Sequence, residues 1–141
     1  MAKAVNLKFD DGFREYAING DENKIIRFNP TDYNIKKRAT EAVEKIKAMA
    51  EKYESMGVDD LTAEEVLDTE TRKMINYICG SDVCSVALGN THAMTICGNA
   101  PIYENFLNAL IPLIESEVKA AQKKVSKKAK SYIDNVKGTE Q

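Results

Sequence analysis

The chain of 141 residues lacks long apolar runs and has only three cysteines and one histidine. No stretch approaches the roughly 20 consecutive apolar residues that a membrane-spanning helix needs. The first residues, MAKAVNLKF, are too short and too polar to resemble a signal peptide. An odd number of cysteines does not form the disulfide framework of a small secreted protein. These absences predict a cytoplasmic protein that does not enter a membrane.

Composition is otherwise ordinary for a globular protein, with 43% hydrophobic and 30% charged residues. A chain of this length predicts one domain with its own core. The formal net charge of −2 gives no whole-chain reason to expect nucleic acid. The charge is unevenly spread, because the last third is basic and the middle segment GVDDLTAEEVLDTETR is acidic. Such asymmetry predicts either a contact with an acidic partner or packing between copies.

Three short runs near the N-terminus alternate between apolar and polar residues, as strands do. They are AVNLKF, with Val5, Leu7 and Phe9 on one face, then EYAI and KIIRF. Asn19-Gly20-Asp21 joins the last two runs, and Asn and Gly tolerate the positive φ angles of tight hairpin turns. We therefore expect a small antiparallel sheet of two or three strands within about residues 3–29. Such a sheet needs a helix across one face.

Two amphipathic helices are predicted to follow, at about residues 32–54 and 62–79. In both, apolar residues recur three and four positions apart. Asn29-Pro30 precedes the first helix, and Gly80 is expected to end the second. Residues 80–100 are rich in Gly, Asn, Ser and Thr but also contain apolar residues, which predicts a short helix and then a loop lying on the core.

The last third of the chain predicts one long helix that starts near residue 101 and has two unlike halves. Its first half is densely apolar, whereas its second half keeps only an apolar thread among lysines. Pro112 inside this helix is expected to kink it. The sequence thus predicts an α+β fold, with a hairpin sheet packed on amphipathic helices over residues 1–118. Residues 119–141 would form a basic helical extension of the long helix.

An apolar stripe that runs past the body of a small domain needs something else to bury it. We therefore predict a partner-binding or oligomer stripe along the long helix, with lysines as its electrostatic rim. The alternative is that residues 106–118 are simply core. The predicted stripe comprises Phe106, Leu110, Leu113, Ile114, Val118, Val125, Tyr132 and Ile133, and its rim Lys123, Lys124, Lys127 and Lys128.

Candidate chemistry is confined to four residues with the spacing C-x4-C-x7-H-x4-C, which are Cys79, Cys84, His92 and Cys97. Three thiolates and an imidazole can hold zinc, but the C-x-x-C knuckle typical of such sites is missing. Buried cysteines beside an exposed histidine are the alternative. The same residues could provide a Cys–His nucleophile pair, yet nothing nearby indicates an orienting group or oxyanion site. No phosphate-binding glycine loop or EF-hand pattern occurs either.

The basic end could contact phosphates, but two features weigh against nucleic acid. No arginine follows Arg72, and Tyr132 is the one aromatic residue among the terminal lysines. A helix on a membrane surface is disfavoured too, because the apolar face of the second half has no Trp or Phe.

Two stretches carry a resemblance to a known family. Residues 18–32, INGDENKIIRFNPTD, lead directly into an amphipathic helix, and residues 103–115, YENFLNALIPLIE, lead into a lysine-rich helix. Both resemble the tail assembly chaperones of phages and prophages of Gram-positive bacteria, which are encoded just upstream of the tape measure protein. The order of predicted elements is similar over most of the chain, and the match is weakest around residues 80–100.

The resemblance implies a non-enzymatic tail morphogenesis factor in the bacterial cytoplasm, with no cofactor and no small-molecule substrate. Its partners would be the largely helical tape measure protein, which such chaperones are thought to coat, and copies of itself. Two alternatives stay open. The chain could be a structural tail protein retained in the finished virion, or a small zinc-binding or interaction domain.

Overall fold

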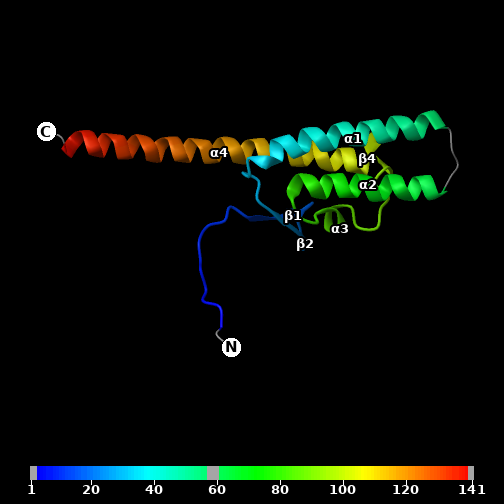
Figure 1. The fold of residues 1–141 in the computed structure, drawn as a ribbon. Helices are drawn as coiled ribbons and strands as arrows, with labels where there is room; N and C mark the ends of the chain where they lie inside the picture. Colours follow the sequence, from blue (N-terminus) through cyan, green and yellow to red (C-terminus); the bar gives the residue numbers. More distant parts are fainter. Residues whose placement is uncertain (1–2, 57–60, 140–141) are drawn as a thin grey trace.

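The computed structural model describes residues 3–56 and 61–139 and shows an α+β fold, as predicted (Figure 1). A β-hairpin comes first, then two antiparallel helices, a short helix with a small second hairpin, and one long helix. In chain order the elements are β1 (Arg14–Ile18), β2 (Asp21–Phe28), α1 (Asn34–Met56), α2 (Leu61–Cys79), α3 (Cys84–Ala87), β3 (Ile96–Cys97), β4 (Ala100–Pro101) and α4 (Ile102–Thr139).

The first hairpin forms where the alternating runs predict it. Strands β1 and β2 pair antiparallel with Tyr16 opposite Ile26, and Ile18 opposite Asp21. The turn residues Asn19 and Gly20 have φ angles of 53° and 75°, which suit a two-residue turn between twisted strands. Ile26 and Phe28 are buried, and the Tyr16 ring lies 5.4 Å from that of Phe28. This face of the hairpin therefore contributes to the core.

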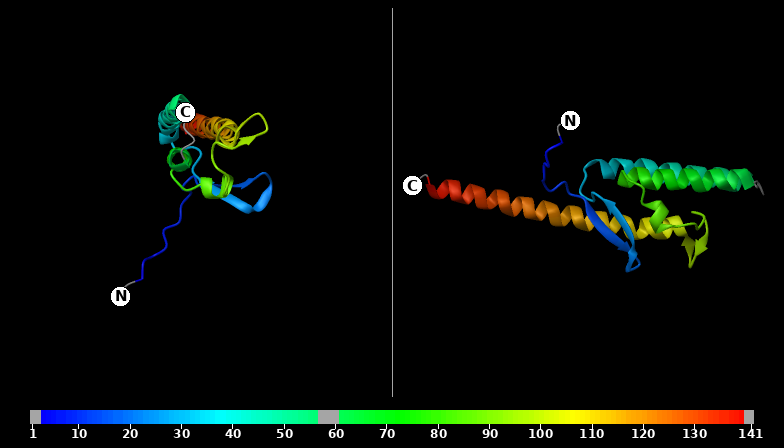
Figure 2. Two further views of the ribbon diagram at one scale, coloured as in Figure 1. Left: turned by 90° about the vertical axis from the view of Figure 1, so that its right-hand side faces the viewer. Right: turned by 90° about the horizontal axis from the view of Figure 1, so that it is seen from below.

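The prediction of a strand at residues 4–9, AVNLKF, is wrong. Residues 3–13 form no strand, and Val5, Leu7 and Phe9 are 93%, 83% and 71% exposed. The segment runs away from the body of the molecule (Figure 2). A strand exists only when another strand accepts its backbone hydrogen bonds, and within the described residues this segment has no such partner. Alternation alone could not supply that information.

Helices α1 and α2 match the predictions within two residues at each end. At the start of α1, the Asp32 carboxylate accepts a hydrogen bond from the Asn34 amide at 2.9 Å. At the end of α2, Gly80 adopts a φ of 70° and its amide donates to the Asn76 carbonyl. The two helices lie side by side and antiparallel (Figures 1 and 2).

Residues 80–100 form the predicted short helix and a loop that lies on the core, with Leu88 and Ala93 buried. The small β3–β4 hairpin was not predicted. Asp68 and Arg72 of α2 hold this region in place. Arg72 pairs with Asp68 at 3.1 Å and donates to the carbonyls of Gly89 and Thr91. Asp68 in turn accepts the Ala93 amide at 2.7 Å.

One hydrophobic core joins the hairpin, α1, α2, α3 and the first half of α4. It joins β2, near the N-terminus, to the first half of α4 and includes none of residues 3–13 or 119–130. Its buried members are Ile26, Phe28, Ile35, Ala42, Ile46, Ile75, Ile78, Cys79, Val83, Cys84, Leu88, Ala93, Leu107, Leu110 and Ile114.

Helix α4 continues through Pro112 without interruption, and Figures 1 and 2 show no sharp bend there. The predicted kink is therefore absent. Proline removes the hydrogen bond to the carbonyl four residues earlier, that of Asn108. Both Pro112 and Asn108 lie on the exposed side of the helix, where water can hydrate the freed carbonyl.

Candidate partner-binding surface

The second half of α4 projects beyond the rest of the molecule (Figure 1). Within residues 119–130, every side chain is exposed except that of Ala121, which is partly buried. Val125 is 69% exposed. Ile133, further along, is 52% exposed. The side chain of Tyr132 lies outside the described residues. We call residues 119–139 the overhang; among its described side chains, those of Val125, Ala129 and Ile133 are exposed in a single copy of the chain.

The first half of the predicted stripe is mostly core. This agrees with the alternative interpretation, in which residues 106–118 are core residues. Leu110 and Ile114 are 2% and 8% exposed and belong to the core. Phe106, Leu113 and Val118 are partly buried and pack against it. A partner could reach only the second half of the stripe and the partly buried residues beside it.

The four lysines of the predicted rim are exposed along the overhang. In the described part of the chain, no acidic side chain lies within ion-pair distance of Lys123, Lys124, Lys127 or Lys128. Like charges three and four residues apart on a helix repel one another. Acidic groups placed beside these lysines would relieve this repulsion.

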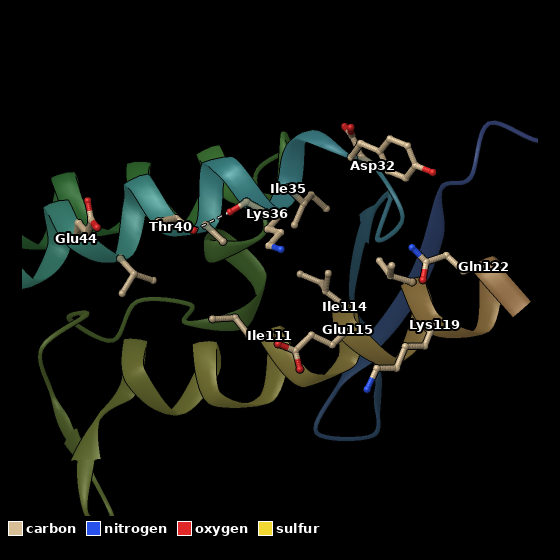
Figure 3. A pocket seen from close by; sticks show the side chains of 14 residues that line it. Asp32, Ile35, Lys36, Thr40, Glu44, Ile111, Ile114, Glu115, Lys119 and Gln122 are labelled. Carbon is tan, nitrogen blue, oxygen red and sulfur yellow. Dashed lines mark hydrogen bonds between the residues drawn. The ribbon is translucent and has the colours of Figure 1, made fainter.

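A groove that the sequence did not predict opens between α1 and α4 where the overhang begins (Figure 3). Its volume is about 910 Å³. Helices α1 and α4 are well separated along most of their length, whereas α1 and α2 pack closely. The apolar walls are Ile35, Ala39 and Val43 of α1 and Ile111, Ile114 and Val118 of α4; polar residues at the edge include Asp32, Lys36, Glu44, Glu115, Lys119 and Gln122.

The groove and the overhang form one apolar track. Ile111, Ile114, Val118, Ala121 and Val125 are spaced by three and four residues, so they lie along the same face of α4. The periodicity of α4 was visible in the sequence. The opposite wall was not, because the separation of α1 from α4 is set by packing between elements far apart in the chain.

The cysteine–histidine cluster does not assemble into a site. His92 is partly buried rather than exposed, and both its ring nitrogens are used. Nε2 lies 2.8 Å from the Glu64 carbonyl oxygen, to which it can only donate, and Nδ1 accepts the Met94 amide at 3.1 Å. In residues 3–56 and 61–139, no group of three or more His, Cys, Asp or Glu side chains could hold a metal ion.

The cysteines are not poised as nucleophiles either. Burial raises the pKa of the Cys79 thiol, and likewise that of Cys84, to about 12. The reactive form of cysteine is the thiolate, which is therefore scarce at neutral pH at both positions. Cys97 is partly exposed but lies outside any such cluster. Cys79 and Cys84 act as small core residues.

No family model, curated protein or solved structure matches this chain. No helix in the described residues is both long and apolar enough to cross a membrane. The features available for a functional interpretation are thus the groove, the overhang and the charges along them.

Proposed function

We propose that this protein is a phage or prophage tail morphogenesis factor, an assembly chaperone that binds the helical tape measure protein in the bacterial cytoplasm and performs no chemistry. The observation that carries the proposal is the exposed overhang of α4, whose apolar face continues from the α1–α4 groove. The resemblance of residues 18–32 and 103–115 to tail assembly chaperones supports the same function.

The physical basis is recognition of a helix by a groove and an extended apolar face. A partner helix can place one end between α1 and α4 and lie along Val118, Ala121 and Val125. The rim lysines, Lys123 and Lys127 among them, would pair with acidic side chains beside the partner's apolar stripe. Each of these contacts contributes only a small binding free energy. Many copies along one long helical protein would together coat it, because binding of neighbouring copies reinforces occupancy.

The test compares two substitutions that introduce the same charge on opposite faces of the overhang. Val125→Asp places a carboxylate on the apolar face, whereas Ala120→Asp places one on the exposed opposite face. Each full-length variant is co-expressed with the tape measure protein of the same tail module, and the amount that copurifies is measured. We expect Val125→Asp to weaken binding at least about tenfold, because a buried valine contributes about 1.5 kcal/mol or more.

Ala120→Asp should bind as the unmodified chain does, which controls for the added charge and the helix propensity of aspartate. Thermal unfolding of both variants should match that of the unmodified protein, because both positions lie outside the core. If the unmodified chain does not copurify with the tape measure protein, or if both variants bind equally well, the proposed function is wrong.

A further inference from the structure

Residues 3–9, which we call the N-terminal arm, have the pattern of a strand but no strand partner. Val5, Leu7 and Phe9 alternate with polar or small residues, so an extended backbone places all three on one face. All three are largely exposed, and the arm leads away from the body (Figure 2). Single exposed apolar side chains are common, but three on one face of a detached segment mark an interaction surface.

The same chain presents a strand edge of the matching kind. Strand β1 pairs with β2 on one side only, and on its other side no described backbone group hydrogen-bonds to it. The outer side of β2 is covered differently, since α3 lies against it and the Ser81 hydroxyl donates to the Arg27 carbonyl at 2.8 Å. The open edge of this sheet is therefore that of β1, and open edges readily accept another strand.

The two elements also match in polarity and charge. On β1, Tyr16 and Ile18 face the core while Glu15 and Ala17 are exposed. A strand that added Val5, Leu7 and Phe9 to the core-facing side would place Lys8 on the outer side, the side that also carries Glu15. Cross-strand neighbours of opposite charge stabilise a sheet, and apolar neighbours do so on the other face.

Residues 10–12, which connect the arm to β1, are held so that the arm leads away from β1 of the same copy. The Asn29 side chain donates to the Asp11 carbonyl at 3.1 Å, and Asp11 lies 3.8 Å from Arg27. Asp10 accepts the Gly12 amide and pairs with Arg14 at 3.2 Å. Pairing with its own β1 would require the chain to reverse at residues 10–12, where these contacts fix its direction.

We propose that the N-terminal arm of one copy adds as a third strand to the open β1 edge of a second copy. Two copies that exchange arms reciprocally form a closed dimer, and copies that pass the arm onward form a chain. This self-association uses a surface separate from the α1–α4 groove and the overhang, so it does not depend on the identity of the partner bound there.

The first test measures the solution mass of the full chain by light scattering. Leu7→Asp introduces a charge on the apolar face of the arm, and Asn6→Asp introduces the same charge on the opposite face. We expect the unmodified chain and Asn6→Asp to form dimers or larger assemblies, and Leu7→Asp to be monomeric with an unchanged far-UV circular dichroism spectrum. A monomeric unmodified chain, or an assembly that Leu7→Asp does not alter, would overturn the proposal.

A disulfide test distinguishes exchange between copies from pairing within one copy. Cys97→Ser serves as the background, because the other two cysteines are buried. A chain with Lys8→Cys is mixed with a chain carrying either Glu15→Cys or Ala17→Cys, and the mixture is oxidised. A disulfide needs Cα atoms about 4.4–6.8 Å apart, so the expected linked heterodimer reports contact between arm and edge.

Lys8→Cys mixed with Lys37→Cys, on the exposed side of α1, should give no linked product above background. If Lys8→Cys and Glu15→Cys on the same chain instead cross-link only within single copies, the arm pairs with its own β1 and the proposal is wrong. Neither result depends on whether Val125→Asp affects the tape measure protein, so this proposal and the proposed function can fail separately.

Discussion

Asp68 shows how a single residue fixes the loop that leads into α4. Burial raises the pKa of its carboxyl, but the hydrogen bond from the Ala93 amide and the ion pair with Arg72 outweigh burial and leave the pKa lowered. Arg72 is then free to donate to the carbonyls of Gly89 and Thr91. In the sequence, Asp68 and Arg72 look like an ordinary helical ion pair four residues apart. Their contacts with residues 89–93 follow only from the fold.

Replacing Asp68 with asparagine should lower the free energy of unfolding by about 2 kcal/mol, because charged hydrogen bonds at a partly buried site are lost. Urea unfolding at pH 7 measures the loss. The folded pKa of Asp68 is lowered, so its contribution is present above the unfolded pKa of about 4 and disappears as pH falls through the folded pKa. The difference between the two proteins should therefore shrink below about pH 4.

Glu22→Gln is the control for that experiment, since it removes one negative charge at the exposed tip of the hairpin. It should change stability by no more than about 0.5 kcal/mol at either pH. A difference between Asp68→Asn and the unmodified protein that persists unchanged to pH 2 would show that the carboxylate is not what stabilises the loop.

At the scale of elements, the sequence predicted the turns and helices that depend on interactions between residues close together in the chain. The Asn19-Gly20 turn, the periodicity of α1 and α2, and the start of α4 beside Pro101 were all found within one or two residues. The strand at AVNLKF was predicted wrongly and the α1–α4 groove was not predicted, because both depend on distant parts of the chain. A strand at residues 3–9 needs a neighbouring strand edge, and the α1–α4 groove exists because two helices far apart in the chain stay separated.

Replacing Pro112 should show how much this proline lowers the stability of α4. In a helix interior, proline is about 3 kcal/mol less favourable than alanine, and the gain in unfolded-chain entropy on replacing it offsets only part of that. Pro112→Ala should therefore raise the free energy of unfolding by about 1–3 kcal/mol, measured by urea unfolding. Ser116→Ala, also exposed and one turn further on, should raise it by only a few tenths. Equal effects of the two would mean that Pro112 causes no strain in α4.

At the scale of the whole molecule, charge divides at the point where the overhang begins. Residues 1–118 contain 13 Lys and Arg against 20 Asp and Glu, a net charge of −7. Residues 119–141 contain 7 against 2, a net charge of +5. Two overhangs placed side by side would repel each other, so the basic end favours an acidic partner over another basic end. The proposed contact between the arm and the β1 edge, by contrast, would rest on backbone hydrogen bonds and apolar side chains.

Salt should therefore separate the two kinds of binding. Between about 50 mM and 500 mM NaCl the screening length falls to a few ångströms, so copurification with the tape measure protein should weaken about tenfold. The solution mass of the chain alone should barely change, because apolar burial and backbone hydrogen bonds are not screened. Replacing Lys123 and Lys127 with glutamine should reduce the salt dependence of partner binding, whereas replacing Lys24 and Lys47, exposed elsewhere, should not. Partner binding that is insensitive to salt would mean that the overhang lysines do not contact the partner.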